Sequence, residues 1–208
     1  MNPFISIFQL IVLIFSVIIH EVSHGFVANR LGDPTAKDAG RLTLNPIKHI
    51  DPIGSILLPL VLYIFNSPIL FGWAKPVPFN PYNLKNPKRD SGLIGMSGPA
   101  SNFLVVIIFS IILKLVGFIS APFVPALIIF LNIIILVNLV LGIFNLVPIP
   151  PLDGSKVLFS FLPAGAVKIE RFLEQYGMFI LLFFIFFGFQ AIIPIVLALY
   201  HLLGGSLF

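Results

Sequence analysis

Two long apolar runs stand next to each other in the middle of the chain and limit what it can fold into. Leu93–Ile119 and Val124–Val147 are joined by a short turn at Ser120-Ala121-Pro122. Each run is longer than the roughly 20 residues that a helix needs to cross the hydrocarbon core of a bilayer. Hydrophobic residues make up 58% of the 208 residues and charged residues only 10%, which is more apolar surface than a soluble domain of this length can bury. We therefore predict an all-α polytopic membrane protein.

Three further apolar segments decide the number of spans. Phe4–Ile19 is predicted to continue as a helix to Asn29, which is long enough to cross the membrane. Gly177–Leu203 contains a proline, so it is either one tilted helix or a broken pair. Ile53–Phe65 has only 13 residues, which is short for a span. The prediction is four to six transmembrane helices in a single domain that covers residues 1–208.

The basic residues predict the orientation of the chain. Apart from Lys114, they fall in three segments, 30–48, 75–89 and 156–171, and the positive-inside rule places these segments on the cytoplasmic side. Both flanks of Ile53–Phe65 then lie on one side, so this segment is predicted to be re-entrant or to lie at the interface. The net charge of +4 is small, and its placement sets topology without indicating a nucleic-acid partner.

A Pro-rich segment follows the re-entrant candidate. Gly72-Trp73-Ala74-Lys75-Pro76-Val77-Pro78 alternates in part, and proline is tolerated only at the edge of a sheet. We expect a short β-like loop, which could hold an extended substrate segment by strand pairing. The alternative is a Pro-rich surface loop.

The sequence His20-Glu21-Val22-Ser23-His24 stands at the end of the first apolar run. Imidazoles four residues apart lie on one face of a helix and can hold one metal ion. Glu21 is displaced by about 100° around the helix, so it can reach a metal-bound water without being a ligand. Such groups are costly inside a bilayer and tend to be functional. The pattern favours a zinc hydrolase site in the membrane over a chance match.

A catalytic zinc usually takes three protein ligands, so a third must lie elsewhere in the chain. There is no cysteine, which leaves histidine and carboxylate ligands. The extended spacing with a third histidine six residues after His24 fails, because Arg30 stands there, and no glutamate lies between Glu21 and Glu170. The remaining candidates are two histidines and five aspartates: His49, His201, Asp33, Asp38, Asp51, Asp90 and Asp153. Of these, Asp33, Asp38 and Asp90 lie in polar loops and are expected to face solvent.

Asp153 differs from the other candidates in its surroundings. It follows Asn145-Leu-Val-Pro-Ile-Pro-Pro-Leu, where three prolines end an apolar helix within the membrane region. A carboxylate placed there is costly unless it binds a cation. The alternative is that Asp153 caps a helix over Gly154–Leu162. We predict a metal ligand, and both roles can coexist.

Together these motifs resemble the site-2 protease family of intramembrane zinc metalloproteases. His20-Glu21-x-x-His24 is paired with Asn145-x-x-Pro-x-Pro-Pro-Leu-Asp153-Gly, and four shorter stretches resemble the short prokaryotic branch, which lacks PDZ and CBS domains. Those stretches are Gly32-Asp-Pro-Thr35, Gly40-Arg-Leu-Thr-Leu-Asn-Pro46, Gly72-Trp-Ala-Lys-Pro-Val-Pro78 and Gly98-Pro-Ala-Ser-Asn102.

The resemblance implies one Zn²⁺ per chain, held by His20, His24 and Asp153, with Glu21 as the catalytic base. It also implies a site near the cytoplasmic surface of a prokaryotic plasma membrane. The lipid bilayer and a single-span membrane protein substrate are the expected partners, and the sequence leaves the oligomeric state open.

An oxyanion formed during cleavage needs amide donors. Asn145 is the better candidate because it stands at the broken helix end, and the resemblance also points to it. Asn102 is the second candidate. Helix–helix hydrogen bonding is the alternative for both, and it is the role we predict for Asn132 and Asn138.

A different class of protein could use the same His/Asp cluster. A membrane transporter or metal channel is the main alternative, but it should show internal repeats and charged groups in both halves. This chain shows neither, and conduction does not need Glu21. A catalytically inactive relative that binds membrane helices is a third possibility, and the intact motif argues against it.

Overall fold

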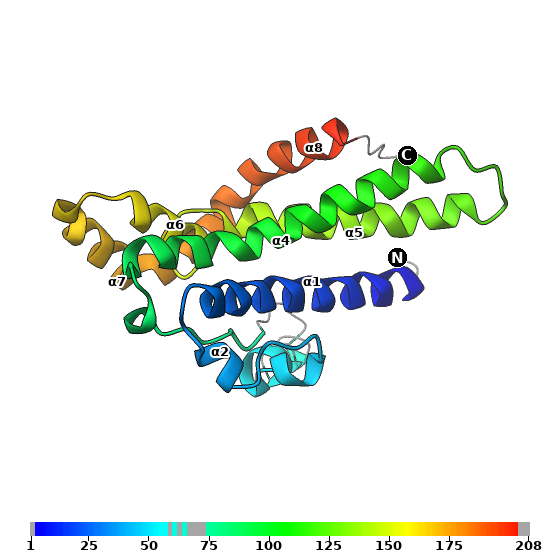
Figure 1. Ribbon diagram of the computed structural model, residues 1–208. Coiled ribbons are helices and arrows are strands. Elements are labelled where there is room, and N and C mark those ends of the chain that lie inside the picture. Colours follow the sequence, from blue (N-terminus) through cyan, green and yellow to red (C-terminus); the bar gives the residue numbers. More distant parts are fainter. Residues whose placement is uncertain (1–2, 58–59, 62–63, 66–73, 204–208) are drawn as a thin grey trace.

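The computed structural model describes residues 3–57, 60–61, 64–65 and 74–203 (Figure 1). Its α-helices are α1 (Pro3–Arg30), α2 (Thr35–Asp38), α4 (Pro87–Val116), α5 (Val124–Asn145), α6 (Asp153–Phe161), α7 (Val167–Phe183) and α8 (Ile192–Leu202). Short 3₁₀ turns lie at Pro46–His49, Pro81–Asn83, Ala164–Ala166 and Phe189–Ala191, and π-type turns at Pro52–Leu57 and Phe184–Gly188. Over these residues the protein contains helices and no strands, as predicted.

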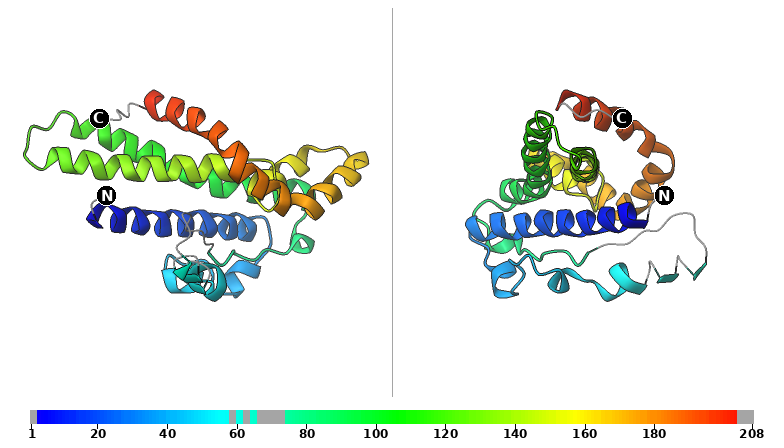
Figure 2. Two further views of the ribbon diagram at one scale, coloured as in Figure 1. Left: turned by 180° about the vertical axis from the view of Figure 1, so that it is seen from behind. Right: turned by 90° about the vertical axis from the view of Figure 1, so that its right-hand side faces the viewer.

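Four helical stretches are long and apolar enough to cross a membrane. They are α1, α4, α5 and the combined stretch Val167–Leu202. This confirms a polytopic membrane protein, with four such helices among the described residues. α1, α4 and α5 run side by side along the molecule (Figures 1 and 2).

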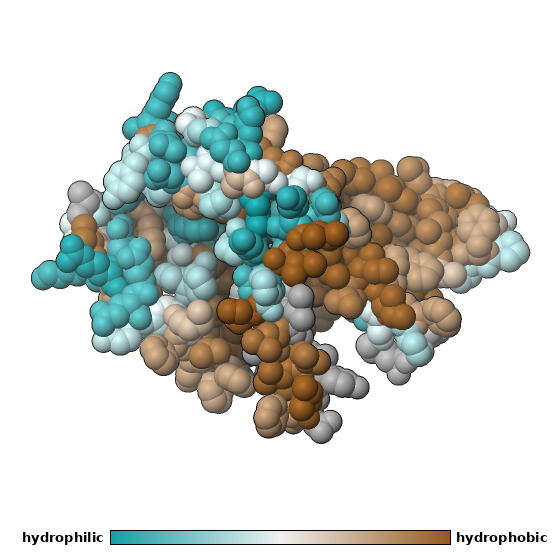
Figure 3. Space-filling model, turned by 90° about the horizontal axis from the view of Figure 1, so that it is seen from below, coloured by the Kyte–Doolittle hydropathy of each residue, from teal (hydrophilic) through white to brown (hydrophobic). Residues whose placement is uncertain are grey.

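α4 is the central helix because it packs against α1, α5 and α6. Val106 of α4, Leu139 of α5 and Tyr200 of α8 belong to the main hydrophobic core. The outward helix faces are also apolar, and Leu104 and Phe179 are more than half exposed, as expected for surfaces in contact with lipid. Hydrophilic residues gather at the end of the molecule that carries α6, whereas the opposite end is mostly hydrophobic (Figure 3).

The last apolar segment is a bent succession of helical turns. Phe184–Gly188 is a π-type turn and Phe189–Ala191 a 3₁₀ turn, and both lie between α7 and α8. Such turns interrupt the regular hydrogen bonds of a helix and change its direction. The chain therefore curves before α8 (Figure 2), which corresponds to the predicted broken pair.

The connection from α5 to α6 positions the predicted ligand Asp153. α5 ends at Asn145, and α6 begins at Asp153 itself. A side chain on the next residue, Gly154, would collide with the backbone carbonyls of Leu146 and Val147. Glycine therefore permits the close turn that directs Asp153 back toward α1.

The two segments predicted to be re-entrant and β-like are described only in part. Ile53 and Leu57, in the π-type turn, are exposed, but residues 58–59, 62–63 and 66–73 lie outside the described part, so re-entry stays a prediction. Residues 74–80 form no regular secondary structure. Over the described residues, this segment is the Pro-rich loop that was the alternative to an edge strand.

Candidate active site

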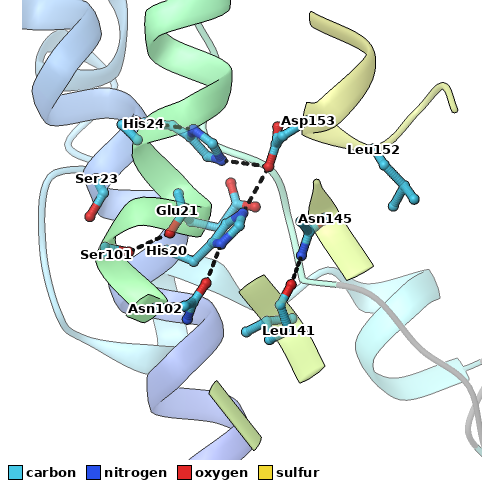
Figure 4. A network of polar contacts seen from close by, with 12 residues as sticks. His20, Glu21, Ser23, His24, Ser101, Asn102, Leu141, Asn145, Leu152 and Asp153 are labelled. Atoms are coloured by element: carbon cyan, nitrogen blue, oxygen red, sulfur yellow. Dashed lines mark hydrogen bonds and ion pairs between the residues drawn. The ribbon is translucent and has the colours of Figure 1, made fainter. Parts of the chain in front are cut away.

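His20 and His24 project from α1 toward Asp153 at the start of α6 (Figure 4). Oδ2 of Asp153 lies 2.9 Å from Nε2 of His20 and 3.0 Å from Nε2 of His24. All three residues are buried, and their potential ligand atoms lie within 4.8 Å of one another. The fold thus brings the three predicted ligands together in an arrangement that could hold one metal ion.

The other ring nitrogen of each histidine also has a partner. Nδ1 of His24 lies 2.6 Å from the backbone carbonyl oxygen of Ile94, and Nδ1 of His20 lies 2.6 Å from Oδ1 of Asn102. A carbonyl oxygen can only accept, so His24 must donate from Nδ1 and its Nε2 is left for a metal. Partners of this kind orient the ligands of metal sites in proteins.

Gly98 of α4 leaves the space in front of the two imidazoles. A Cβ at this position would lie 2.5 Å from Nε2 of both His20 and His24. In the sequence, Gly98 begins one of the stretches that resemble the site-2 protease family. Its position facing the two Nε2 atoms could not be predicted from sequence spacing alone.

The two carboxylate oxygens of Asp153 have different partners. Oδ2 faces the histidines, and Oδ1 accepts a hydrogen bond of 2.9 Å from Nζ of Lys156. Lys156 was not among the predicted site residues, although a residue three positions after Asp153 lies on the same side of a helix. The alternative role as helix cap does not apply, because Leu152 occupies the N-cap position of α6 and Asp153 is the first residue of the helix.

Glu21 lies beside the cluster and lines the same cavity. The cavity has a volume of about 150 Å³, and its lining also includes Asn145 and Lys156. Oε2 of Glu21 accepts a hydrogen bond of 2.8 Å from the backbone N–H of Val77. A carboxylate beside a potential metal site, but outside the ligand set, has the placement that a general base requires.

The Pro-rich loop forms one wall of this cavity through Pro76, Val77 and Phe79. Arg41 donates to the carbonyl oxygen of Lys75 at 2.6 Å, and the N–H of Lys75 donates to the carbonyl oxygen of His49 at 2.9 Å. His49 therefore supports the loop and is not part of the cluster. His201, at the end of α8, also lies outside the cluster.

Asp33 forms hydrogen bonds with the C-terminal end of the same loop, at Asn80 and Asn83. Its carboxylate accepts hydrogen bonds from the N–H of Asn80 at 2.6 Å and from Nδ2 of Asn83 at 2.7 Å, and two more from Thr35. Although burial alone raises the pKa of Asp33, these hydrogen bonds outweigh it and lower the pKa below its usual range. The prediction that Asp33 and Asp90 face solvent is wrong, because both are buried. Asp90 accepts from the N–H of Asn86 at the start of α4.

The two predicted oxyanion donors occupy different positions. Asn145 lines the cavity, and its Nδ2 donates to the carbonyl oxygen of Leu141 at 3.0 Å. Asn102 is fully buried. Its Oδ1 is hydrogen-bonded to Nδ1 of His20, and its Nδ2 donates to Oδ1 of Asn138. The oxyanion role of each stays a prediction, and the helix–helix hydrogen bonding named as the alternative is what the structure shows for Asn102.

Comparison of the sequence with known proteins identifies the family of this chain. The family model described as peptidase family M50 matches residues 116–188, which include Asn145 and Asp153. YwhC of Bacillus subtilis, named as a zinc metalloprotease, is 40% identical over 179 residues, or 84% of this chain and 78% of that protein. The chain belongs to peptidase family M50, the site-2 protease family. It is a zinc metalloendopeptidase.

More distant relatives agree with this membership. Rip2 of Mycolicibacterium smegmatis, also named as a zinc metalloprotease, is 29% identical over 85% of this chain. A zinc metalloprotease of Methanocaldococcus jannaschii is 27% identical over 94% of it. The chain spans only 66% and 48% of the lengths of these two relatives. No solved structure shows significant similarity to the chain.

The residues present fit zinc, the cofactor of the family. Two imidazole nitrogens and one carboxylate oxygen are typical ligands of a catalytic zinc, which keeps a fourth position open for water. The buried cluster provides these three groups, and Gly98 leaves the adjoining space free.

Proposed function

We propose that this M50 peptidase cleaves single-span membrane proteins within their transmembrane segments, with His20, His24 and Asp153 as zinc ligands and Glu21 as general base. The observation that carries the proposal is the position of the cluster. Two of its members lie on α1, which is long and apolar enough to cross a membrane, and the cavity beside them contains Glu21. A buried ionisable group in such a helix indicates a functional site.

The proposed chemistry assigns a task to each group in the cavity. A zinc ion bound by the three ligands would supply an activated water and polarise the scissile carbonyl. Glu21 takes the proton of the attacking water and passes it to the leaving amine. The N–H of Val77 occupies Oε2 of Glu21, which leaves Oε1 for that proton. Asn145 and Lys156 line the same space and can stabilise negative charge on the cleaved carbonyl.

The position of the site along α1 supports access from the cytoplasm of a prokaryotic cell. His20 stands ten residues before Arg30 at the end of α1, a distance of about 15 Å along a helix. The three basic segments would lie on that side of the plasma membrane under the positive-inside rule. The bilayer and the substrate helix are then the partners, and no part of the proposal involves nucleic acid.

Reconstitution of the purified protein tests the proposal directly. A tagged single-span substrate is incubated in liposomes with the wild type and with Glu21→Gln, and bound zinc is measured in both. We expect cleavage within the membrane segment by the wild type, and loss of at least about 100-fold in the variant with zinc retained, since general base catalysis contributes at least that factor.

Two outcomes would contradict the proposal. Cleavage confined to the soluble part of the substrate would exclude the intramembrane specificity while leaving the peptidase activity. An uncut substrate together with zinc flux across the liposome would favour the transporter or channel alternative, which membership in a peptidase family does not favour.

A further inference from the structure

A chain of hydrogen bonds between buried polar groups runs from His20 into the interior of the helix bundle. It connects Ser16 on α1, Asn102 on α4 and Asn138 on α5. Ser16 is 4% exposed, and both asparagines are fully buried. Polar groups at this depth are costly unless all are hydrogen-bonded.

The chain has a fixed direction that begins at a backbone carbonyl. Nδ2 of Asn138 lies 2.9 Å from the carbonyl oxygen of Ile134, one turn earlier in α5. A carbonyl oxygen only accepts, so the NH₂ group of Asn138 must be on that side. The same NH₂ group donates to Oγ of Ser16 at 2.9 Å. Oδ1 of Asn138 then has to face Asn102.

The orientation of Asn138 determines that of Asn102. Oδ1 of Asn138 accepts from Nδ2 of Asn102 at 3.0 Å, and a longer contact of 3.4 Å joins the same Nδ2 to the carbonyl oxygen of Ser16. With its NH₂ group so engaged, Asn102 can present only Oδ1 to His20. His20 must therefore carry a proton on Nδ1, which leaves Nε2, beside Oδ2 of Asp153, as the nitrogen that can bind a metal.

We propose that Asn138 and Ser16 are positioning residues of the metal site, which fix the amide of Asn102 and, through it, the tautomer of His20. His24 obtains the same tautomer directly from the carbonyl oxygen of Ile94. His20 obtains this tautomer through the amides of Asn102 and Asn138, whose orientation is fixed by the carbonyl oxygen of Ile134. The inference rests on the metal site and does not depend on where substrates are cleaved.

The competing explanation is that the two asparagines only join α1, α4 and α5, which is a common use of asparagine in membrane helices. That role predicts lower thermal stability for a variant but no change in metal affinity or tautomer. The positioning role predicts both changes. Zinc affinity and the protonation of the His20 ring therefore separate the two explanations without any activity measurement.

The experiment uses the full chain in detergent with Asn138→Ala, and Asn132→Ala as the matched control. Asn132 lies on the same helix but outside this chain of hydrogen bonds. Zinc affinity is measured by competition with a chelator, and the histidine tautomers of the metal-free protein by ¹⁵N NMR on labelled histidine. For Asn138→Ala we expect about a 10-fold loss of zinc affinity, the low end for removal of a group behind a ligand. We also expect partial loss of the Nδ1–H form of His20, and Asn132→Ala should match the wild type.

A second pair of variants tests whether Asn138 acts through Asn102. The carboxylate of Asn102→Asp can only accept, so it should set the His20 tautomer without Asn138. In that background, adding Asn138→Ala should cause no further loss of zinc affinity. Ser16→Ala covers the case in which Asn138→Ala does not fold: because it removes one acceptor from Asn138, it should lower zinc affinity by less than about 10-fold, and unchanged zinc affinity and His20 tautomer in Ser16→Ala would also overturn the proposal. Unchanged affinity and tautomer in Asn138→Ala, or equal losses from Asn138→Ala with and without Asn102→Asp, would overturn the proposal.

Discussion

The backbone N–H of Val77 donates to Oε2 of Glu21 at 2.8 Å, so the Pro-rich loop contacts the proposed base directly. Val77 is flanked by Pro76 and Pro78, which have no N–H of their own. Only Val77 among these three residues can therefore hold the carboxylate. The sequence suggested that this loop captures substrate as a strand, but the donor expected for such pairing is already used by Glu21.

Replacing Val77 by proline removes this one hydrogen bond. We expect Val77→Pro to lower kcat by about 10-fold or more, since a charge-assisted hydrogen bond contributes roughly 1.5–3 kcal/mol. Zinc content should not change, because the N–H of Val77 donates to Glu21 and not to one of the three proposed ligands. The measurement is steady-state cleavage of a tagged single-span substrate with zinc determined in parallel.

The control for this prediction is Val77→Ala, which keeps the N–H and shortens the side chain. It should retain most of the kcat. If both variants lose activity equally, the side chain of Val77 matters and the hydrogen bond to Glu21 does not.

Lys156 is expected to support zinc binding through Asp153. Its Nζ donates a hydrogen bond to Oδ1 of Asp153, while Oδ2 of the same carboxylate faces the two histidines. Lys156→Met keeps the length of the side chain and removes the charge, so zinc affinity should fall by about 10-fold, as is typical for groups behind a ligand. Competition with a chelator measures this change. Lys168→Met, at an exposed position on α7, should leave the affinity unchanged; a fall of the same size there would point to a general effect of surface charge.

The sequence was sufficient, for a physical reason, to predict a polytopic helical protein and the three side chains that cluster at the site. Apolar length alone defines a membrane helix, and a carboxylate such as Asp153 beside three prolines is too costly in a membrane without a partner. The partners of those ligands could not be predicted. α5 is apolar almost all round, so no hydrophobic periodicity shows which face of it turns Asn138 toward Asn102. The contact of Val77 with Glu21 depends on how a loop without periodic structure folds back.

Gly98 is expected to be essential for metal binding. A Cβ there would lie 2.5 Å from Nε2 of His20 and of His24, and close-packed helices cannot move apart without cost. Gly98→Ala should therefore abolish high-affinity zinc binding, while circular dichroism shows unchanged helix content. Gly165→Ala is the control, because a Cβ there meets no atom within 4 Å. Wild-type zinc affinity in Gly98→Ala would show that metal binding does not require the space left by Gly98.

Asp33 is expected to make the stability of the protein depend on pH. Its folded-state pKa is lowered by hydrogen bonds from Thr35, Asn83 and Asn80, which outweigh the opposing effect of burial. A carboxyl group with a lowered pKa stabilises the folded state above its unfolded pKa of about 3.9, and this stabilisation is lost as the pH falls through the folded value.

Asp33→Asn should therefore lower the melting temperature at pH 7, by about 2–4 °C for each kcal/mol lost in a chain of this size. The difference from the wild type should shrink below about pH 4. Thermal unfolding in detergent from pH 3 to pH 8 measures both, with Asp38→Asn, at an exposed position in α2, as the control. A difference between Asp33→Asn and the wild type that stays constant over this range would show that the charge of Asp33 does not hold the loop.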